Sequence, residues 1–122
     1  MVIRVCEVCG RPHPERHHIV FRSQGGLDFE LNYKDLCAEH HKGNYSPHGN
    51  RYVDLTYKRQ LQERLFSIFT ESYYSIDEIS KMLGCKMKDL ERRFKTAQPD
   101  PKTLCHYPSE TVVRVLMGGR LY

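Results

Sequence analysis

Two spaced pairs of metal-binding residue types constrain the fold of this chain more than any other feature of its sequence. Two residues separate Cys6 from Cys9, and two residues separate Cys37 from His40. This spacing lets a tight turn direct both side chains of a pair at one point, and four such ligands complete the tetrahedron that Zn²⁺ prefers. We therefore predict a closed, structural zinc site of Cys6, Cys9, Cys37 and His40, which joins the N-terminus to the segment around Cys37.

The other cysteines and the composition set the context. Five cysteines are an odd number for a disulfide framework, and closely spaced cysteines in a reducing compartment are more often metal ligands. We expect Cys85 and Cys105 to be buried or semi-buried free thiols. The sequence has neither an apolar run of about 20 residues nor the apolar segment of a signal peptide, which predicts a cytoplasmic protein without a membrane partner. The net charge of +4 permits an anionic partner such as nucleic acid but does not establish one.

The second half of the chain is predicted to be helical. Apolar residues at helical spacing predict a helix from about 54 to 71, with Asp54 as its N-cap. These apolar residues are Tyr57, Leu61, Leu65, Ile68 and Phe69. Ser109 is the expected cap of a short last helix, which stops at Gly118 and Gly119.

The stretch from 75 to 95 has the size and spacing of a helix-turn-helix. Ser75 and Glu78 predict a capping box at its start, and Gly84 ends the first helix in the left-handed conformation. Basic residues exceed acidic ones from 81 to 95, which favours contact with DNA phosphates over an ordinary solvated helix face. The expected DNA contacts are Lys86, Lys88, Arg92, Arg93 and Lys95. The whole stretch from 54 onward is equally compatible with a helical lid that completes the core of the N-terminal part.

A second set of motifs lies between and around the two metal-binding pairs. Residues 16–22, RHHIVFR, are predicted to form a strand, and SQGG after them is a loop signal. Along the chain come HHI, then GG, then LNYKDL, then LCAEHH. In this order, over roughly residues 4 to 50 and with the paired ligands interleaved, they resemble the zinc-stabilised HNH endonucleases common in phage and mobile-element proteins.

The resemblance implies both a fold and an activity. The fold is α+β, with a small ββα-metal core and a structural zinc knuckle in residues 1–53, a connecting helix in 54–72 and a helix-turn-helix-like region in 73–122. The activity is metal-dependent hydrolysis of DNA phosphodiester bonds, with Mg²⁺ or Mn²⁺ as the expected catalytic ion, other divalent ions being possible, and with DNA as the partner. It also implies the cytoplasm of a bacterial or phage-infected cell.

The resemblance further assigns roles to single residues. His18 matches the first histidine of the motif and is the expected general base, a role suited to imidazole because it titrates near neutral pH. His17 and His41 match ligands of the catalytic ion, and Asn32 matches the residue that holds the loop and the base through hydrogen bonds. His40 stands where the family more often has cysteine. Adjacent strand residues point to opposite faces, so His17 and His18 can serve one site only if the strand is locally twisted or bulged.

Three further residues and two other function classes stay open. His48 and Asn44, in the polar loop after His41, are candidates for the metal or the scissile phosphate, although a solvated loop histidine is the simpler interpretation of His48. His13 is expected at the surface. The alternative function is a non-catalytic, zinc-stabilised module that binds DNA or a protein partner, for example a phage regulatory or inhibitor protein. A purely structural zinc protein would leave the clustered histidines unexplained.

Overall fold

Two antiparallel strand pairs and five α-helices make up the described part of the chain, residues 3–122 of the computed structural model, so the fold is α+β. In chain order the elements are β1 Glu15–His18, β2 Tyr33–Leu36, α1 Ala38–Lys42, α2 Arg51–Ile68, β3 Tyr73–Ser75, α3 Ile76–Leu83, α4 Met87–Phe94, β4 His106–Pro108 and α5 Ser109–Leu116. Short 3-10 turns at Arg22–Gln24 and Glu30–Asn32 lie between β1 and β2.

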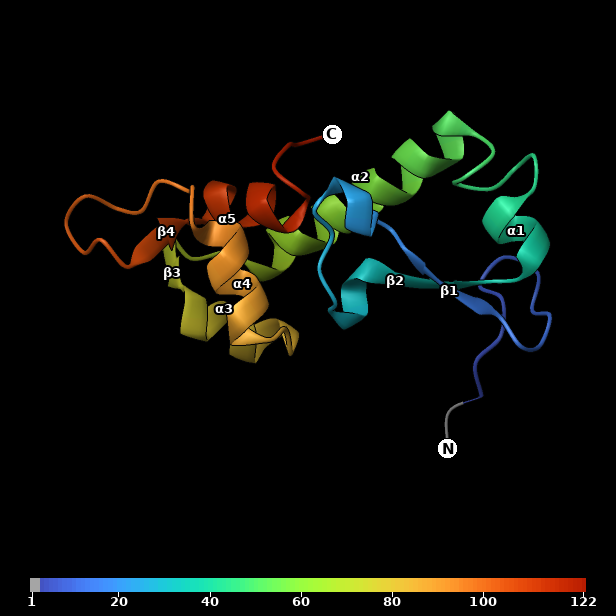
Figure 1. The fold of residues 1–122 in the computed structure, drawn as a ribbon, viewed down its shortest axis with the longest axis horizontal. Helices are drawn as coiled ribbons and strands as arrows, with labels where there is room; N and C mark the ends of the chain where they lie inside the picture. Colours follow the sequence, from blue (N-terminus) through green and yellow to red (C-terminus); the bar gives the residue numbers. More distant parts are fainter. Residues whose placement is uncertain (1–2) are drawn as a thin grey trace.

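The strands β1 and β2 and the helix α1 form one end of the molecule (Figure 1). The strands pair antiparallel and one to one, with His17 opposite Lys34 and His18 opposite Tyr33. The sequence predicted a strand over 16–22, but β1 ends at His18 because Ile19 and Val20 turn into the hydrophobic core. The resulting order is strand, strand, helix.

Helix α2 runs from this end to the remaining helices (Figure 1). It begins at Arg51, three residues before the expected start, and its N-cap is Asn50, whose side chain accepts hydrogen bonds from the backbone N–H groups of Tyr52 and Val53. The prediction of Asp54 as the cap was therefore wrong. Asp54 lies inside the first helical turn, and its carboxylate binds Lys58 instead.

The C-terminal part contains the two expected short helices, α3 and α4. Ser75 accepts a hydrogen bond from the N–H of Glu78 while the Glu78 carboxylate accepts one from the N–H of Ser75, so the predicted capping box is confirmed. Gly84 ends α3 with a φ of 70°, a left-handed conformation that glycine adopts without strain. Ser109 does not cap α5: it is the first helical residue and follows Pro108, which cannot supply a side-chain cap.

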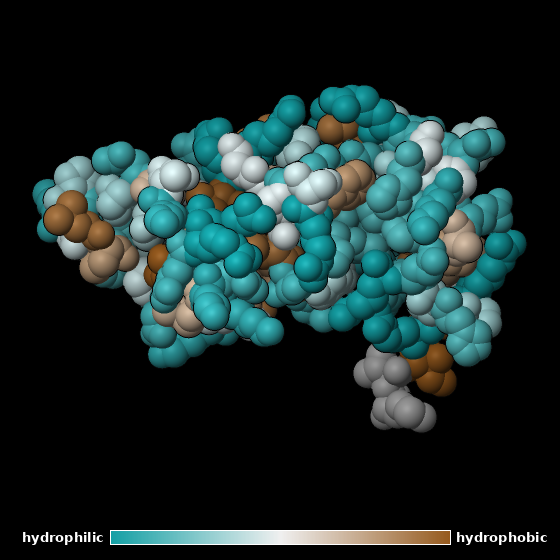
Figure 2. Space-filling view, viewed as in Figure 1, coloured by the Kyte–Doolittle hydropathy of each residue, from teal (hydrophilic) through white to brown (hydrophobic). Residues whose placement is uncertain are grey.

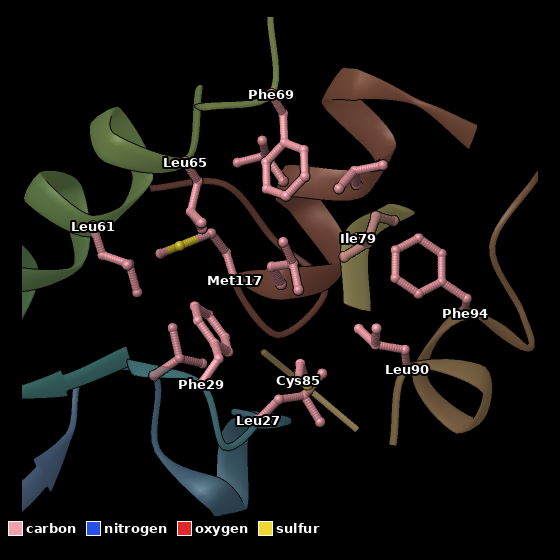
Figure 3. Packing of buried hydrophobic residues seen from close by; sticks show 14 of the residues in the cluster. Leu27, Phe29, Leu61, Leu65, Phe69, Ile79, Cys85, Leu90, Phe94 and Met117 are labelled. Atoms are coloured by element: carbon pink, nitrogen blue, oxygen red, sulfur yellow. The ribbon is translucent and has the colours of Figure 1, made fainter. Parts of the chain in front are cut away.

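One main hydrophobic core joins the two ends of the molecule. Leu27 and Phe29, from the loop between β1 and β2, belong to the same buried cluster as Leu61 and Leu65 of α2 and Met117 beside α5 (Figure 3). The segments 1–53, 54–72 and 73–122 of the sequence therefore share a core. Burial of this apolar surface fixes the helices against the β1–β2 loop.

The free cysteines outside the spaced pairs differ in exposure. Cys85 is buried in the main core, as expected, whereas Cys105 is exposed in the loop before β4, so the expectation of a buried or semi-buried thiol was wrong for Cys105. On the face shown in Figure 2 most residues are hydrophilic, and the apolar ones lie in small separate groups. Within residues 3–122, no helix combines the length and apolar character needed to cross a bilayer.

Candidate metal centres

The first candidate centre is formed by the two spaced pairs. The side chains of Cys6, Cys9, Cys37 and His40 converge, with their ligand atoms all within 4.8 Å of one another. Cys6 and Cys9 come from the turn before β1, Cys37 lies between β2 and α1, and His40 lies in α1. The predicted convergence is therefore confirmed, and the four side chains could hold a metal ion.

The spacing of these atoms fits a small tetrahedral ion. The sulfurs of Cys9 and Cys37 are 3.8 Å apart, and Nδ1 of His40 lies 3.3 Å from the sulfur of Cys37 and 3.6 Å from that of Cys6. A tetrahedral Zn²⁺ with Zn–S of about 2.3 Å and Zn–N of about 2.0 Å has sulfur–sulfur edges of about 3.8 Å and sulfur–nitrogen edges of about 3.5 Å. The donor set of three thiols and one imidazole is also one that zinc prefers.

The electrostatics of these thiols favour a bound cation. Burial raises the pKa of Cys6, but backbone N–H groups, first that of Cys37, and the His40 ring lower it more, so the pKa of Cys6 falls to about 6. The backbone N–H of His40 is the main cause that lowers the pKa of Cys37. Although the backbone N–H of Arg11 opposes it, burial and the neighbouring thiols raise the pKa of Cys9. Three crowded sulfurs therefore resist full deprotonation until a cation offsets their mutual repulsion.

The second candidate centre consists of His17, His41 and His48, whose ligand atoms also lie within 4.8 Å of one another. Their ring centroids are 4.8–5.1 Å apart. His17 comes from β1, His41 from α1 and His48 from the loop before α2. The structure thus brings together the two predicted ligands and adds His48, which is exposed, as expected of a loop residue, and yet lies beside both other rings.

Two details of the hydrogen bonding bear on the ability of these rings to hold a cation. Nε2 of His17 is buried and has no hydrogen-bond partner within residues 3–122, and a buried nitrogen without a partner is costly unless something else binds it. Nδ1 of His41 lies 2.8 Å from the carboxylate of Glu15, which directs Nε2 of the same ring at the cluster. A carboxylate on the outer nitrogen of a histidine ligand fixes its tautomer and orientation.

The charge state of the cluster also suits metal binding. Burial first, and then the rings of His41 and His48, lower the pKa of His17 to about 3. Burial and the ring of His41 likewise lower the pKa of His48. Both rings are therefore neutral at physiological pH, and neutral imidazole is the form that binds metal ions. The ring of Phe21 stacks on His48 at 4.8 Å between centroids and shields one side of the cluster.

The predicted base, His18, has different surroundings from His17. Its Nε2 lies 2.8 Å from Oδ1 of Asp28, which also accepts a hydrogen bond from Tyr33 and pairs with Arg22. Because β1 and β2 pair one to one at both histidines, no bulge turns His18 toward the site of His17, and only the twist of the strand can bring the two residues to one site. His18 is not one of the three clustered histidines. Its role as general base stays a prediction.

Asn32 is fully buried and ties the β1–β2 loop together. Its Oδ1 accepts from the N–H of Val20, and its Nδ2 donates to the carbonyls of Val20 and Leu27 at 3.2 and 2.9 Å. These bonds fix the loop that follows His17 and His18, the positioning role expected of this residue. No hydrogen bond from Asn32 to His18 is present among residues 3–122.

We expect Asn32→Ala to lower the free energy of unfolding by about 2–3 kcal/mol. The substitution leaves buried groups of Val20 and Leu27 without partners, and each such group costs roughly 1–3 kcal/mol, part of which relaxation of the loop recovers. Urea unfolding measures the loss. The matched control is Asn44→Ala, because Asn44 is exposed. Equal stability of the two variants would show that the hydrogen bonds of Asn32 contribute little.

The remaining site predictions lie away from both clusters. The five basic residues expected to contact DNA lie on or beside α4 and are all exposed: Lys86, Lys88, Arg92, Arg93 and Lys95. His13 is exposed, as predicted.

The comparisons with known proteins add no assignment. No protein-family model, no curated protein and no solved structure matches this chain.

Proposed function

We propose that the chain is a metal-dependent DNA endonuclease of the HNH type, in which Cys6, Cys9, Cys37 and His40 bind a structural zinc ion and His17, His41 and His48 bind a catalytic divalent cation. The main support for the proposal is the buried Nε2 of His17, which has no hydrogen-bond partner within residues 3–122 and lies in the three-histidine cluster. The separate cage of three cysteines and His40 is formed by neighbouring segments of the chain. A single structural metal site would explain the cage but not this second set of convergent rings.

The neighbouring residues support the chemistry. His17, His41 and His48 would hold a divalent cation, with Mg²⁺ or Mn²⁺ as the expected ions and other divalent ions possible; when bound, it would supply positive charge to a scissile phosphate and to the leaving oxygen. His18 is the proposed base. The pKa of Asp28 is lowered, first by its hydrogen bond with His18, so Asp28 is ionised and accepts from Nε2–H of that ring. Nδ1 of His18 is then the atom that takes a proton from water.

The proposal is tested by nicking of supercoiled plasmid with Mg²⁺ or Mn²⁺, together with Mn²⁺ binding by electron paramagnetic resonance. We expect His41→Ala to lose Mn²⁺ binding and to slow cleavage by at least about 100-fold, because it removes a ligand and its link to Glu15. His18→Ala should slow cleavage but keep Mn²⁺ binding, because His18 lies outside the cluster.

The control is His13→Ala, an exposed histidine outside both clusters, which should behave as wild type. If the wild-type protein does not cleave DNA in the presence of any divalent ion tested, and binds no metal at the histidines, the nuclease proposal fails. The non-catalytic binding module then becomes the better interpretation, because the cysteine cage and the basic helix α4 do not depend on catalysis.

A further inference from the structure

A groove lies between the β1–β2 loop and the helix α4. One cavity of about 490 Å³ is lined by Gly25, Arg93 and Thr96 and by the end of α5 near Gly118. A smaller cavity of about 270 Å³ is lined by the loop on one side and by α4 on the other. The two cavities adjoin, because Arg93 lines both and because Gly25 and Gly26 are neighbours on the same loop.

Close backbone packing gives this groove a rigid wall. A Cβ atom on Gly118 would lie 2.2 Å from the carbonyl oxygen of Gln24, and one on Gly26 would lie 1.8 Å from that of Val20. A side chain at either position would therefore force the backbone apart. The loop is held against the turn after α5, so the groove is part of the folded architecture.

The groove is rich in arginine. Four of these residues line its two cavities: Arg22, Arg92, Arg93 and Arg114. Arg22, Arg92 and Arg114 pair with carboxylates at 2.8–3.2 Å, and both side chains of each pair are at least 20% exposed. Exposed pairs of this kind are worth about 0–1 kcal/mol, so a stronger anion can replace a carboxylate. Arg93 has no carboxylate partner within residues 3–122, and its guanidinium is free for an external anion.

The groove also leads to the predicted base. Asp28 lines the smaller cavity and at the same time holds His18 through Nε2. Arg22, in the same cavity, binds the other oxygen of Asp28. A phosphate that follows the groove from α4 therefore arrives at the Asp28–His18 pair. In contrast, Lys86, Lys88 and Lys95 line neither cavity.

We propose that this groove binds the phosphodiester backbone of DNA and that Arg93 makes its central contact. The inference rests on the proposed nuclease function, which supplies DNA as the partner. It distinguishes among the basic residues of α4, because only Arg92 and Arg93 face the β1–β2 loop. Guanidinium groups bind phosphate oxygens through paired N–H donors, a geometry that lysine does not offer.

The test measures binding of a fluorescein-labelled duplex by anisotropy at several salt concentrations, without Mg²⁺ or Mn²⁺ and in the His41→Ala background. We expect Arg93→Ala to weaken binding about tenfold and to reduce the slope of log K against log salt by about 1. Arg93→Lys should keep the slope but recover only part of the affinity. The charge-matched control is Lys102→Ala, because Lys102 is exposed and lines neither cavity. Thermal unfolding checks that the variants fold alike.

The outcomes separate this inference from the nuclease proposal. Equal affinity of Arg93→Ala and Lys102→Ala for the duplex would overturn the proposal that the groove binds DNA, even if the wild-type protein cuts DNA. An RNA competitor that displaces the duplex better than unlabelled DNA would overturn it as well. If the wild-type protein never cleaves but Arg93→Ala binds DNA about tenfold more weakly, the nuclease proposal fails and the groove stands.

Discussion

Loss of the metal from the cage of Cys6, Cys9, Cys37 and His40 is expected to unfold the end of the molecule that contains β1, β2 and α1. Within residues 3–122, the separate hydrophobic cluster at this end consists of Cys6, Leu36 and Cys37, with Tyr57 packed against it. So small a cluster cannot compensate for the conformational entropy of the surrounding chain. Structural zinc contributes about 10–16 kcal/mol of apparent binding free energy, and this free energy becomes folding free energy.

Native mass spectrometry and circular dichroism test this expectation. The purified protein should carry a zinc ion at the cage, and Cys37→Ser should lose that ion together with the ordered structure of β1 and β2. The matched control is Cys105→Ser, because Cys105 is an exposed thiol outside the cage. A Cys37→Ser protein that retains stoichiometric zinc and the thermal unfolding curve of wild type would show that these four side chains do not form a zinc site.

The buried ion pair of α2 should show the second large effect. Lys58 is 1% exposed; its Nζ lies 2.7 Å from Oδ2 of Asp54 and 4.3 Å from the centroid of the Phe21 ring. We expect Asp54→Asn to lower the free energy of unfolding by about 3–5 kcal/mol, because it leaves a buried ammonium group without a countercharge. The double variant Asp54→Leu with Lys58→Met should recover most of this loss, since it removes both buried charges.

The chain offers a matched control for that measurement. Asp77 and Lys81 have the same four-residue spacing and the same order in α3, but their side chains are 62% and 77% exposed. Asp77→Asn should therefore cost less than about 1 kcal/mol. Chemical denaturation of both variants gives the comparison. A similar loss at the two positions would mean that burial adds nothing to the Asp54–Lys58 pair. Lys58 also contacts Phe21, which stacks on His48. Mn²⁺ binding by the Asp54→Asn variant therefore shows whether the Asp54–Lys58 pair helps to position the histidine cluster.

The cysteine–histidine cage and the ends of α3 could be predicted from local sequence patterns. The two-residue spacing within each pair limits where the second ligand can lie, so convergence of the cage could be expected from sequence. The capping box of Ser75 and Glu78 and the left-handed Gly84 are also local, because each depends on residues within one helical turn. The start of α2 was missed because Asn50 and Asp54 are both possible caps, and the choice was made by the buried Lys58, which engages the carboxylate of Asp54.

The second cluster could be predicted only in part. His17 and His41 were expected from the resemblance, but His48 lies in a polar loop whose composition is typical of a solvated segment. Its stacking on Phe21 joins residues that 26 positions separate in the sequence, and no periodicity in the sequence indicates this contact. Equally, the basic residues of α4 gave no indication of which ones face a groove, because that depends on the β1–β2 loop packed opposite.

The sequence by itself thus determined the four-residue cage, the α+β sequence of elements and the ends of α3, because short-range spacing and capping act within a few residues. Only the tertiary structure decided that His48 joins His17 and His41, that His18 turns to Asp28 instead, and that Arg93 faces a loop from the other half of the chain. Those arrangements come from burial of one shared core, whose contacts join residues far apart in the sequence.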